Sequence, residues 1–450
     1  MIEVLVAAML AQGILVLGGL GLMQLISGRE RLCPLTALPY GWCFGVLILY
    51  LFGSIAVRIP ALTGRWHYVV AAACCVAAVA GWWRWRTGSE GVESRQVKSK
   101  WSWLDGMFLG LILLKVVFAA YVLMVNPVID ADAAHLDLWV GLSKVIAHEG
   151  TLPEGTSHLA RLFCPSLLPA WTHRFLPRWH DGLISLPWLV TYLSFIGVGF
   201  TTCYSLTRSR AASLVAAYFL SAIPLGVAHV MRPGYSDFIV AYFFLVALSF
   251  VLRIFFKTGA AVPASLLACL AAFGGLLTKE EGNLLFVWVI AVIGSFYISD
   301  KKGIEWKKIL IIQIVGLAVI YGVYFFGADL IRPHIESGRM QYLFTKSFNV
   351  RAIGVFFDEV FGRGTFNLLW WFAFGMMSFL VLRKTPAPSK ALTIYLILLF
   401  AGVFYFCCFT VNIQFTLKRT NAPRFLLQII GIWLPLYVMF CRDILLVDER

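Results

Sequence analysis

Two aspartates, Asp130 and Asp132, stand two residues apart in a polar stretch that directly follows a long apolar run. A carboxylate at the mouth of a membrane-embedded cavity is suited to act as a general base, which removes the proton of a hydroxyl or amine. Like charges this close raise the pKa of one member. We therefore predict these two as catalytic residues. One alternative is that both are ordinary solvated acids of a loop. Another is a cation site with oxygen ligands, although two carboxylates are too few for a full coordination shell.

If a lipid phosphate leaves in such a reaction, this anion needs cations, and the predicted outer face of the protein supplies them. Arg and Lys hold phosphates by charge and by paired hydrogen bonds. General attraction to anionic lipid headgroups is the alternative for each residue. The predicted substrate-binding residues are His135, Arg232, Tyr235, Asp237, Lys279, Glu280, Arg332, Arg339, Arg351 and Arg424.

Other ionisable side chains are predicted to have structural roles. Lys115 lies in the middle of an apolar run, where a charge is expensive and needs a partner. His173, His180 and Asp181 precede another run, and we predict that they form a hydrogen-bonding cluster at the membrane interface.

Membrane helices must position these residues. Of the 450 residues, 60% are apolar and 13% are charged, against about 25% charged residues in soluble domains. The apolar runs are continuous, which excludes an outer-membrane barrel with alternating strands. Charge asymmetry across a membrane explains the pI of about 9.4 better than nucleic-acid binding does.

The apolar runs predict an all-α polytopic membrane protein with about thirteen transmembrane helices, because about 20 apolar residues cross a bilayer. The first run is predicted to be a span, since it lacks the basic start of a signal peptide. The runs are 2–26, 41–57, 67–83, 103–125, 182–206, 211–230, 236–256, 261–278, 283–298, 308–328, 366–382, 391–410 and 422–440.

The loops between the runs predict the orientation. Alternate loops, 73 residues in all, carry 20 Lys and Arg, whereas the other face carries 16 in more than 120 residues. Cytoplasmic loops are rich in Lys and Arg. The chain is therefore expected to begin outside and to end in the cytoplasm.

The predicted outer face holds the long loops, 126–181 and 329–365. Long loops are uncommon unless they have a function, so this is the predicted working face. Within the first loop, 133–148 and a second piece from Leu159 to Trp171 have an apolar and a polar side. Such helices are expected to lie in the membrane interface.

The ten cysteines mostly fall inside the runs, and only Cys164 lies in an outer loop. These positions predict no disulfide framework, and their spacing does not match that of zinc ligands. The chain also has no Gly-rich phosphate loop for a nucleotide sugar.

Residues 103–440 resemble the GT-C superfamily of polytopic glycosyltransferases, which includes protein O-mannosyltransferases and the lipid A aminoarabinose transferase. The stretch D-A-D-A-A-H-L from Asp130 is similar to the D-A-x-A-Y-H-L pattern of some bacterial members. Y-S-D-F at 235–238 and T-K-E-E-G at 278–282 resemble later turns of such chains.

The resemblance implies a GT-C-like module with interfacial helices in its first long periplasmic loop, in a bacterial inner membrane. A sugar would pass, with inversion, from a polyprenyl-phosphate donor to a glycan, lipid or protein acceptor, and no cofactor is obligatory, although a divalent cation is possible. Many relatives have adjacent acids, whereas an alanine separates them here. The base is thus Asp130 or Asp132, and position favours Asp130.

The resemblance leaves residues 1–102 as an added three-helix element with a cytoplasmic linker, and 441–450 as a cytoplasmic tail. Two other functions stay open. A transporter or lipid flippase shares the number of spans but is expected to show internal repeats and broken spans. A lipid-linked polysaccharide polymerase or ligase differs only in its acceptor.

Overall fold

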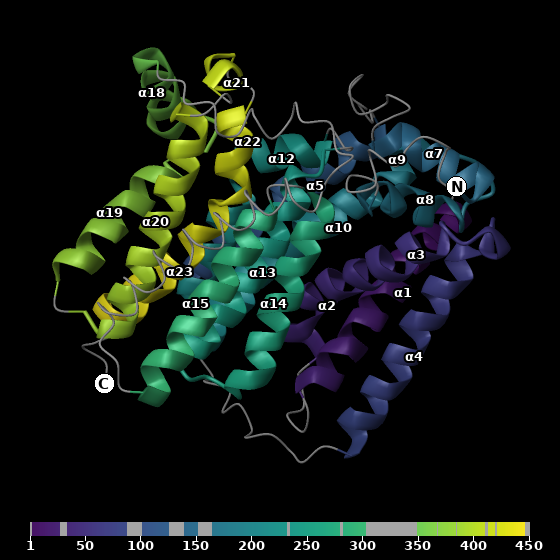
Figure 1. Cartoon of the computed structure of the whole chain (residues 1–450), viewed down its shortest axis with the longest axis horizontal. Helices are drawn as coiled ribbons and strands as arrows, with labels where there is room; N and C mark the ends of the chain where they lie inside the picture. The colour runs from purple at the N-terminus through teal and green to yellow at the C-terminus, as the bar shows by residue number, and fades with distance from the viewer. Residues whose placement is uncertain are drawn as a thin grey trace, which may run out of the picture. The chain divides into compact units, whose positions relative to one another are not determined.

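The structure is a computed structural model, and every regular element in the part that it describes is a helix (Figure 1). The chain divides into two compact units, Met1–Phe286 and Val287–Arg450. The described residues are 2–27, 34–87, 101–125, 139–151, 164–231, 235–279, 282–302, 349–366, 368–383, 385–409, 413–418 and 421–445.

The first unit begins with three long helices, α1 (Ile2–Ser27), α2 (Pro34–Ile48) and α4 (Trp66–Thr87). A π-helical turn and the short α3 (Ser54–Ala56) follow α2. α1 packs against both α2 and α4, and glycines allow the close approach. A Cβ atom on Gly19 would lie 1.9 Å from the carbonyl oxygen of Gly41. Small residues at such crossings let the backbones of membrane helices meet.

This crossing yields a prediction. Gly19→Ala is expected to destabilise the protein by about 1–3 kcal/mol, because the added methyl group meets backbone atoms that cannot rotate away. Gly13 lies on the same helix, and a Cβ atom added there would have nothing within 4 Å, so Gly13→Ala is the matched control. Thermal unfolding in detergent measures both. Equal midpoints for the two variants would show that the crossing tolerates a side chain.

Hydrogen bonds tie these first helices to later ones, α10 (Leu186–Thr207) and α13 (Asp237–Phe255). Trp42 donates to the Thr191 hydroxyl at 2.9 Å. The hydroxyl groups of Tyr40 and Thr202 lie 2.8 Å apart, and Tyr242 donates to the Pro39 carbonyl. The helices before residue 102 therefore pack into the same unit as α10 and α13.

The remaining helices of the first unit pack against α10 or against α13, whose side chains are almost all buried. At one end of the unit, Arg210 pairs with Asp105 at 2.9 Å and thereby joins the starts of two helices. Lys115 lies 5.9 Å from the ring centre of Tyr218, a cation–π partner of the kind expected for it. These helices are α5 (Trp103–Val125), α11 (Arg210–Ser221), α12 (Pro224–Met231) and α14 (Ala261–Thr278).

The second unit begins within α15 (Gly282–Lys302) and has an aromatic core. Phe356 packs edge-on against Phe400 and Phe404, with centroids 5.9 and 5.2 Å away. Part of the predicted loop 329–365 is helical here, as α18 (Val350–Phe357) and a π-helical turn at Asp358–Gly362. The other helices are α19 (Leu369–Leu382), α20 (Ala387–Phe409), α21 (Ile413–Leu417), α22 (Asn421–Gln428) and α23 (Trp433–Phe440).

Eight helices in the described ranges are long and apolar enough to cross a membrane, or ten if two bent pairs each form one span. The bent pairs replace straight helices at 211–230 and 422–440. The predicted spans 283–298 and 366–382 correspond to shorter apolar helical segments, Gly282–Ile298 and Leu369–Leu382. The predicted span 308–328 lies outside the described residues. The fold thus indicates a multi-pass membrane protein, while the number thirteen stays a prediction.

Candidate functional site

Short helices join α5 to α10 at one end of the first unit: α7 (Trp139–Glu149), α8 (Leu167–His173) and α9 (Asp181–Ile184). For the piece predicted from Leu159 to Trp171, a position on the membrane surface is wrong for residues 164–171, which are buried in protein, while residues 159–163 lie outside the described residues. Trp171 donates to the Ala11 carbonyl at 2.9 Å, and Gln12 donates to Thr172 at 2.9 Å. The apolar side of α7 is buried against protein, and part of it packs on α8.

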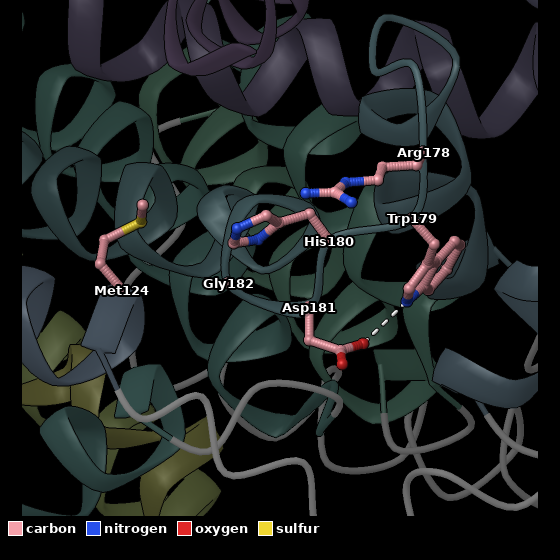
Figure 2. Close-up of a pocket in the computed structure, with 6 residues that line it drawn as sticks. All are labelled: Met124, Arg178, Trp179, His180, Asp181 and Gly182. Atoms are coloured by element: carbon pink, nitrogen blue, oxygen red, sulfur yellow. Dashed lines mark hydrogen bonds between the residues drawn. The ribbon is translucent and has the colours of Figure 1, made fainter. Parts of the chain in front are cut away.

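An open hollow of about 370 Å³ lies beside these helices (Figure 2). Trp179 donates to Asp181 at 2.8 Å, and the His180 ring accepts a hydrogen bond from the Leu183 amide, which caps α9. His180 and Asp181 thus each form a hydrogen bond to a neighbouring residue, whereas none joins them to one another or to His173 among the described residues, so the predicted shared cluster stays a prediction. The hollow is lined by Met124, Arg178, Trp179, His180, Asp181 and Gly182.

The hollow combines a cation, a carboxylate, an imidazole and an indole around one space. Arg178 is exposed there and can meet an anion, and the Trp179 indole lines the same space. Met124 forms the opposite wall in Figure 2 and lies in the last turn of α5. The last turn of α5 therefore lies at the edge of this hollow.

A second polar cluster joins the start of α13 to the end of α14. The Lys279 ammonium lies 2.7 Å from the Asp237 carboxylate, whose side chain is fully buried. Asp237 also stands in the first turn of α13, where the helix dipole favours negative charge. Lys279 thus has a structural partner within the protein, in addition to its predicted role toward a phosphate.

The turn before α13 is fixed to α10. Trp188 donates to the Tyr235 carbonyl at 3.0 Å, and the Tyr235 ring lies edge-on to His229 with centroids 5.6 Å apart. Trp188 is seven residues after Asp181, which corresponds to about 10 Å along a helix. The hollow and the Asp237–Lys279 cluster therefore lie at the same end of the first unit.

The structure thus brings three predicted binding residues together: Tyr235, Asp237 and Lys279. In the second unit, Arg351 is exposed on α18, and Arg424 is half-buried on α22. A cavity shared by all of these stays a prediction. Outside the described residues lie the predicted residues Asp130, Asp132, His135, Arg232, Glu280, Arg332 and Arg339.

Several residues at this end escaped prediction from the sequence. Arg174, Arg178 and Trp179 belong to the stretch T-H-R-F-L-P-R-W-H-D-G at 172–182, which mixes basic and aromatic residues just before a span. Lys144 of α7 lies 5.3 Å from the centre of the Trp179 ring. The density of basic and aromatic residues in this stretch was the available signal.

Thiol chemistry has little support at this end. Burial raises the pKa of Cys164 to about 12, so the thiol stays protonated at neutral pH. None of the nine cysteines in the described ranges belongs to a disulfide. Within those same ranges, no three His, Cys, Asp or Glu side chains meet as a metal site.

Comparison with known proteins gives no further assignment. No family model, curated protein or solved structure matches the chain.

Proposed function

We propose that this membrane protein is a glycosyltransferase that moves a sugar from a polyprenyl-phosphate donor to an acceptor on the periplasmic face of a bacterial inner membrane. One observation carries the proposal. α5 ends at the edge of a hollow lined by Arg178, Trp179 and His180, at one end of an apolar helical unit, and the acid pair follows α5 in the sequence. A lipid-linked donor and a polar acceptor would meet at such a boundary.

In the proposed reaction, Asp130 takes the proton of the acceptor hydroxyl or amine, with Asp132 as the alternative base. The acceptor atom bonds to the anomeric carbon as the bond from this carbon to the phosphate oxygen breaks, which inverts the carbon. Arg and Lys side chains stabilise the phosphate that leaves. The same chemistry serves a glycan, lipid or protein acceptor, including the growing chain of a polymerase or ligase.

A transfer assay with the purified full-length protein tests the proposal. Proteoliposomes would receive a panel of polyprenyl-phosphate hexoses and pentoses, with envelope glycolipids as acceptors. We expect release of polyprenyl phosphate and labelling of the acceptor with at least one donor, and equal rates with and without a chelator. Failure with every donor and acceptor pair would contradict the proposal.

The proposed orientation gives a separate prediction. In a variant without native cysteines, Ser157→Cys should react with a membrane-impermeant reagent added outside the cell, and Ser94→Cys should react only after permeabilisation. The predicted charge difference between the two faces is the reason. The reverse pattern would place the 126–181 loop in the cytoplasm and remove a periplasmic acceptor.

A transporter is the second candidate, because two predicted spans are bent pairs. α11 and α12 meet at 59°, and the pair at 422–443 bends by 43°. Transporters place broken helices of this kind at substrate sites. Uptake of a sugar or lipid into the same proteoliposomes, without any change to its covalent bonds, would favour this candidate over a transferase.

A further inference from the structure

We propose that Arg174, with His173 and His67, forms a binding site for a phosphate-type oxyanion next to α4 and α8. We call these three residues the oxyanion cluster. The site does not depend on the sugar-transfer proposal, and none of its members belongs to the residues predicted for that reaction. Either a lipid phosphate headgroup or free phosphate would supply the shared chemistry.

The guanidinium of Arg174 carries the argument. Its Nε and Nη2 atoms are buried and have no hydrogen-bond partner among the described residues. The N–H groups of these two atoms point in the same direction, as the fork that binds two oxygens of one phosphate or carboxylate. No ion pair joins Arg174 to a carboxylate in the described ranges. A buried charged fork without partners is costly, and an oxyanion removes that cost.

Two histidines complete the cluster. The Nδ1 atoms of His173 and His67 are buried and likewise have no partner within the described part of the chain. His173 precedes Arg174 in sequence, and His67 interacts electrostatically with Arg174. The Trp66 and Trp171 rings, 6.4 Å apart, bring the start of α4 against α8 and so place these residues together. Each imidazole can donate one hydrogen bond to a bound oxyanion.

The surroundings favour negative charge. The His148 ring lies 5.4 Å from the His173 ring, and Lys144 lies over Trp179, whose ring is 5.2 Å from His173. Burial, followed by the charges of His148 and Arg174, lowers the pKa of His173. Burial also lowers the pKa of Arg174. An oxyanion would reverse both shifts, because it stabilises the charged forms.

The oxyanion cluster lies beside an exposed part of the surface of the unit. Tyr68, next to His67 in sequence, is 66% exposed and interacts electrostatically with Arg174. Most of α4 beyond it is apolar and exposed. A phospholipid whose chains lie along α4 could thus place its phosphate at Arg174, and free phosphate would reach the same atoms from water.

Phosphate binding by the purified full-length protein tests this site. Thermal unfolding in detergent, at constant ionic strength, gives the apparent Kd for inorganic phosphate. We expect Arg174→Gln to raise this Kd at least tenfold, and Arg174→Lys, which keeps the charge but not the fork, to raise it severalfold. Arg65 is exposed two residues before His67, and Arg65→Gln should leave the Kd within twofold of wild type.

A second arm distinguishes the sources. Short-chain phosphatidic acid, compared with phosphatidylcholine, is added to the same proteins. Tighter binding of phosphatidic acid than of phosphate, lost in the Arg174→Lys variant, would assign the site to a headgroup. Equal affinities would assign it to phosphate alone. Absence of binding in wild type, or equal binding by wild type and both Arg174 variants, would overturn the proposal.

Discussion

Replacing Asp130 with asparagine is expected to lower the rate of sugar transfer by about 10²–10⁴-fold, the usual loss when a general base is removed. The amide keeps the size of the side chain but cannot accept a proton at neutral pH. Asp132→Asn should cost less, because position favours Asp130 as the base. Single-turnover transfer from a lipid-linked donor measures the chemical step.

The nearby acid Asp137 provides the matched control, since it lies in the same segment and is predicted to point away from the apolar side of its helix. Asp137→Asn should transfer at a near-normal rate, and all three variants should elute as folded protein in detergent. A near-normal rate for Asp130→Asn would remove this residue as the base. A large loss for Asp132→Asn alone would transfer the role to it.

Breaking the Asp237–Lys279 pair should have the largest effect on stability. Lys279→Met removes the cation that lies 2.7 Å from the fully buried Asp237 carboxylate, and removal of one partner of a buried pair typically costs about 3–5 kcal/mol. We expect a marked drop in the thermal unfolding midpoint. Lys418→Met, at an exposed lysine, should leave the midpoint unchanged.

A variant with both residues replaced separates this structural role from phosphate binding. Asp237→Asn combined with Lys279→Gln removes both charges and should recover much of the stability lost in Lys279→Met. If Lys279 instead serves chiefly to bind the phosphate of the sugar donor, Lys279→Met would keep the wild-type unfolding midpoint and raise only the KM for that donor. An unchanged midpoint would therefore contradict the structural pair.

Most of the helices could be predicted from the sequence because a membrane span is a local signal. About 20 apolar residues define it regardless of the rest of the chain. The bend between α11 and α12 was not predicted, although Pro224 at the start of α12 breaks helical hydrogen bonding and was the available sign. The burial of α8 could not be predicted, because its partners Ala11 and Gln12 lie about 160 residues earlier.

The candidate site was predictable to a similar extent. Tyr235, Asp237 and Lys279 belong to polar turns between apolar runs, which made them candidates, and the structure places them at the same end of the first unit. The mutual pairing of Asp237 and Lys279 was not predicted, since residues 42 positions apart carry no mark of contact. Arg174 was missed for the same reason: His67 lies on a helix more than 100 residues earlier, and only folding brings the two together.

The hydrogen bonds between α2 and α10 also constrain the order of assembly during synthesis. Trp42 is made 149 residues before its acceptor Thr191, an interval of about 7–30 s at 5–20 residues per second. Through that interval the indole N–H and the hydroxyl groups near it lack their partners, and hydrocarbon offers no replacement. We therefore expect the early helices to reach their final packing only after α10 has entered the membrane.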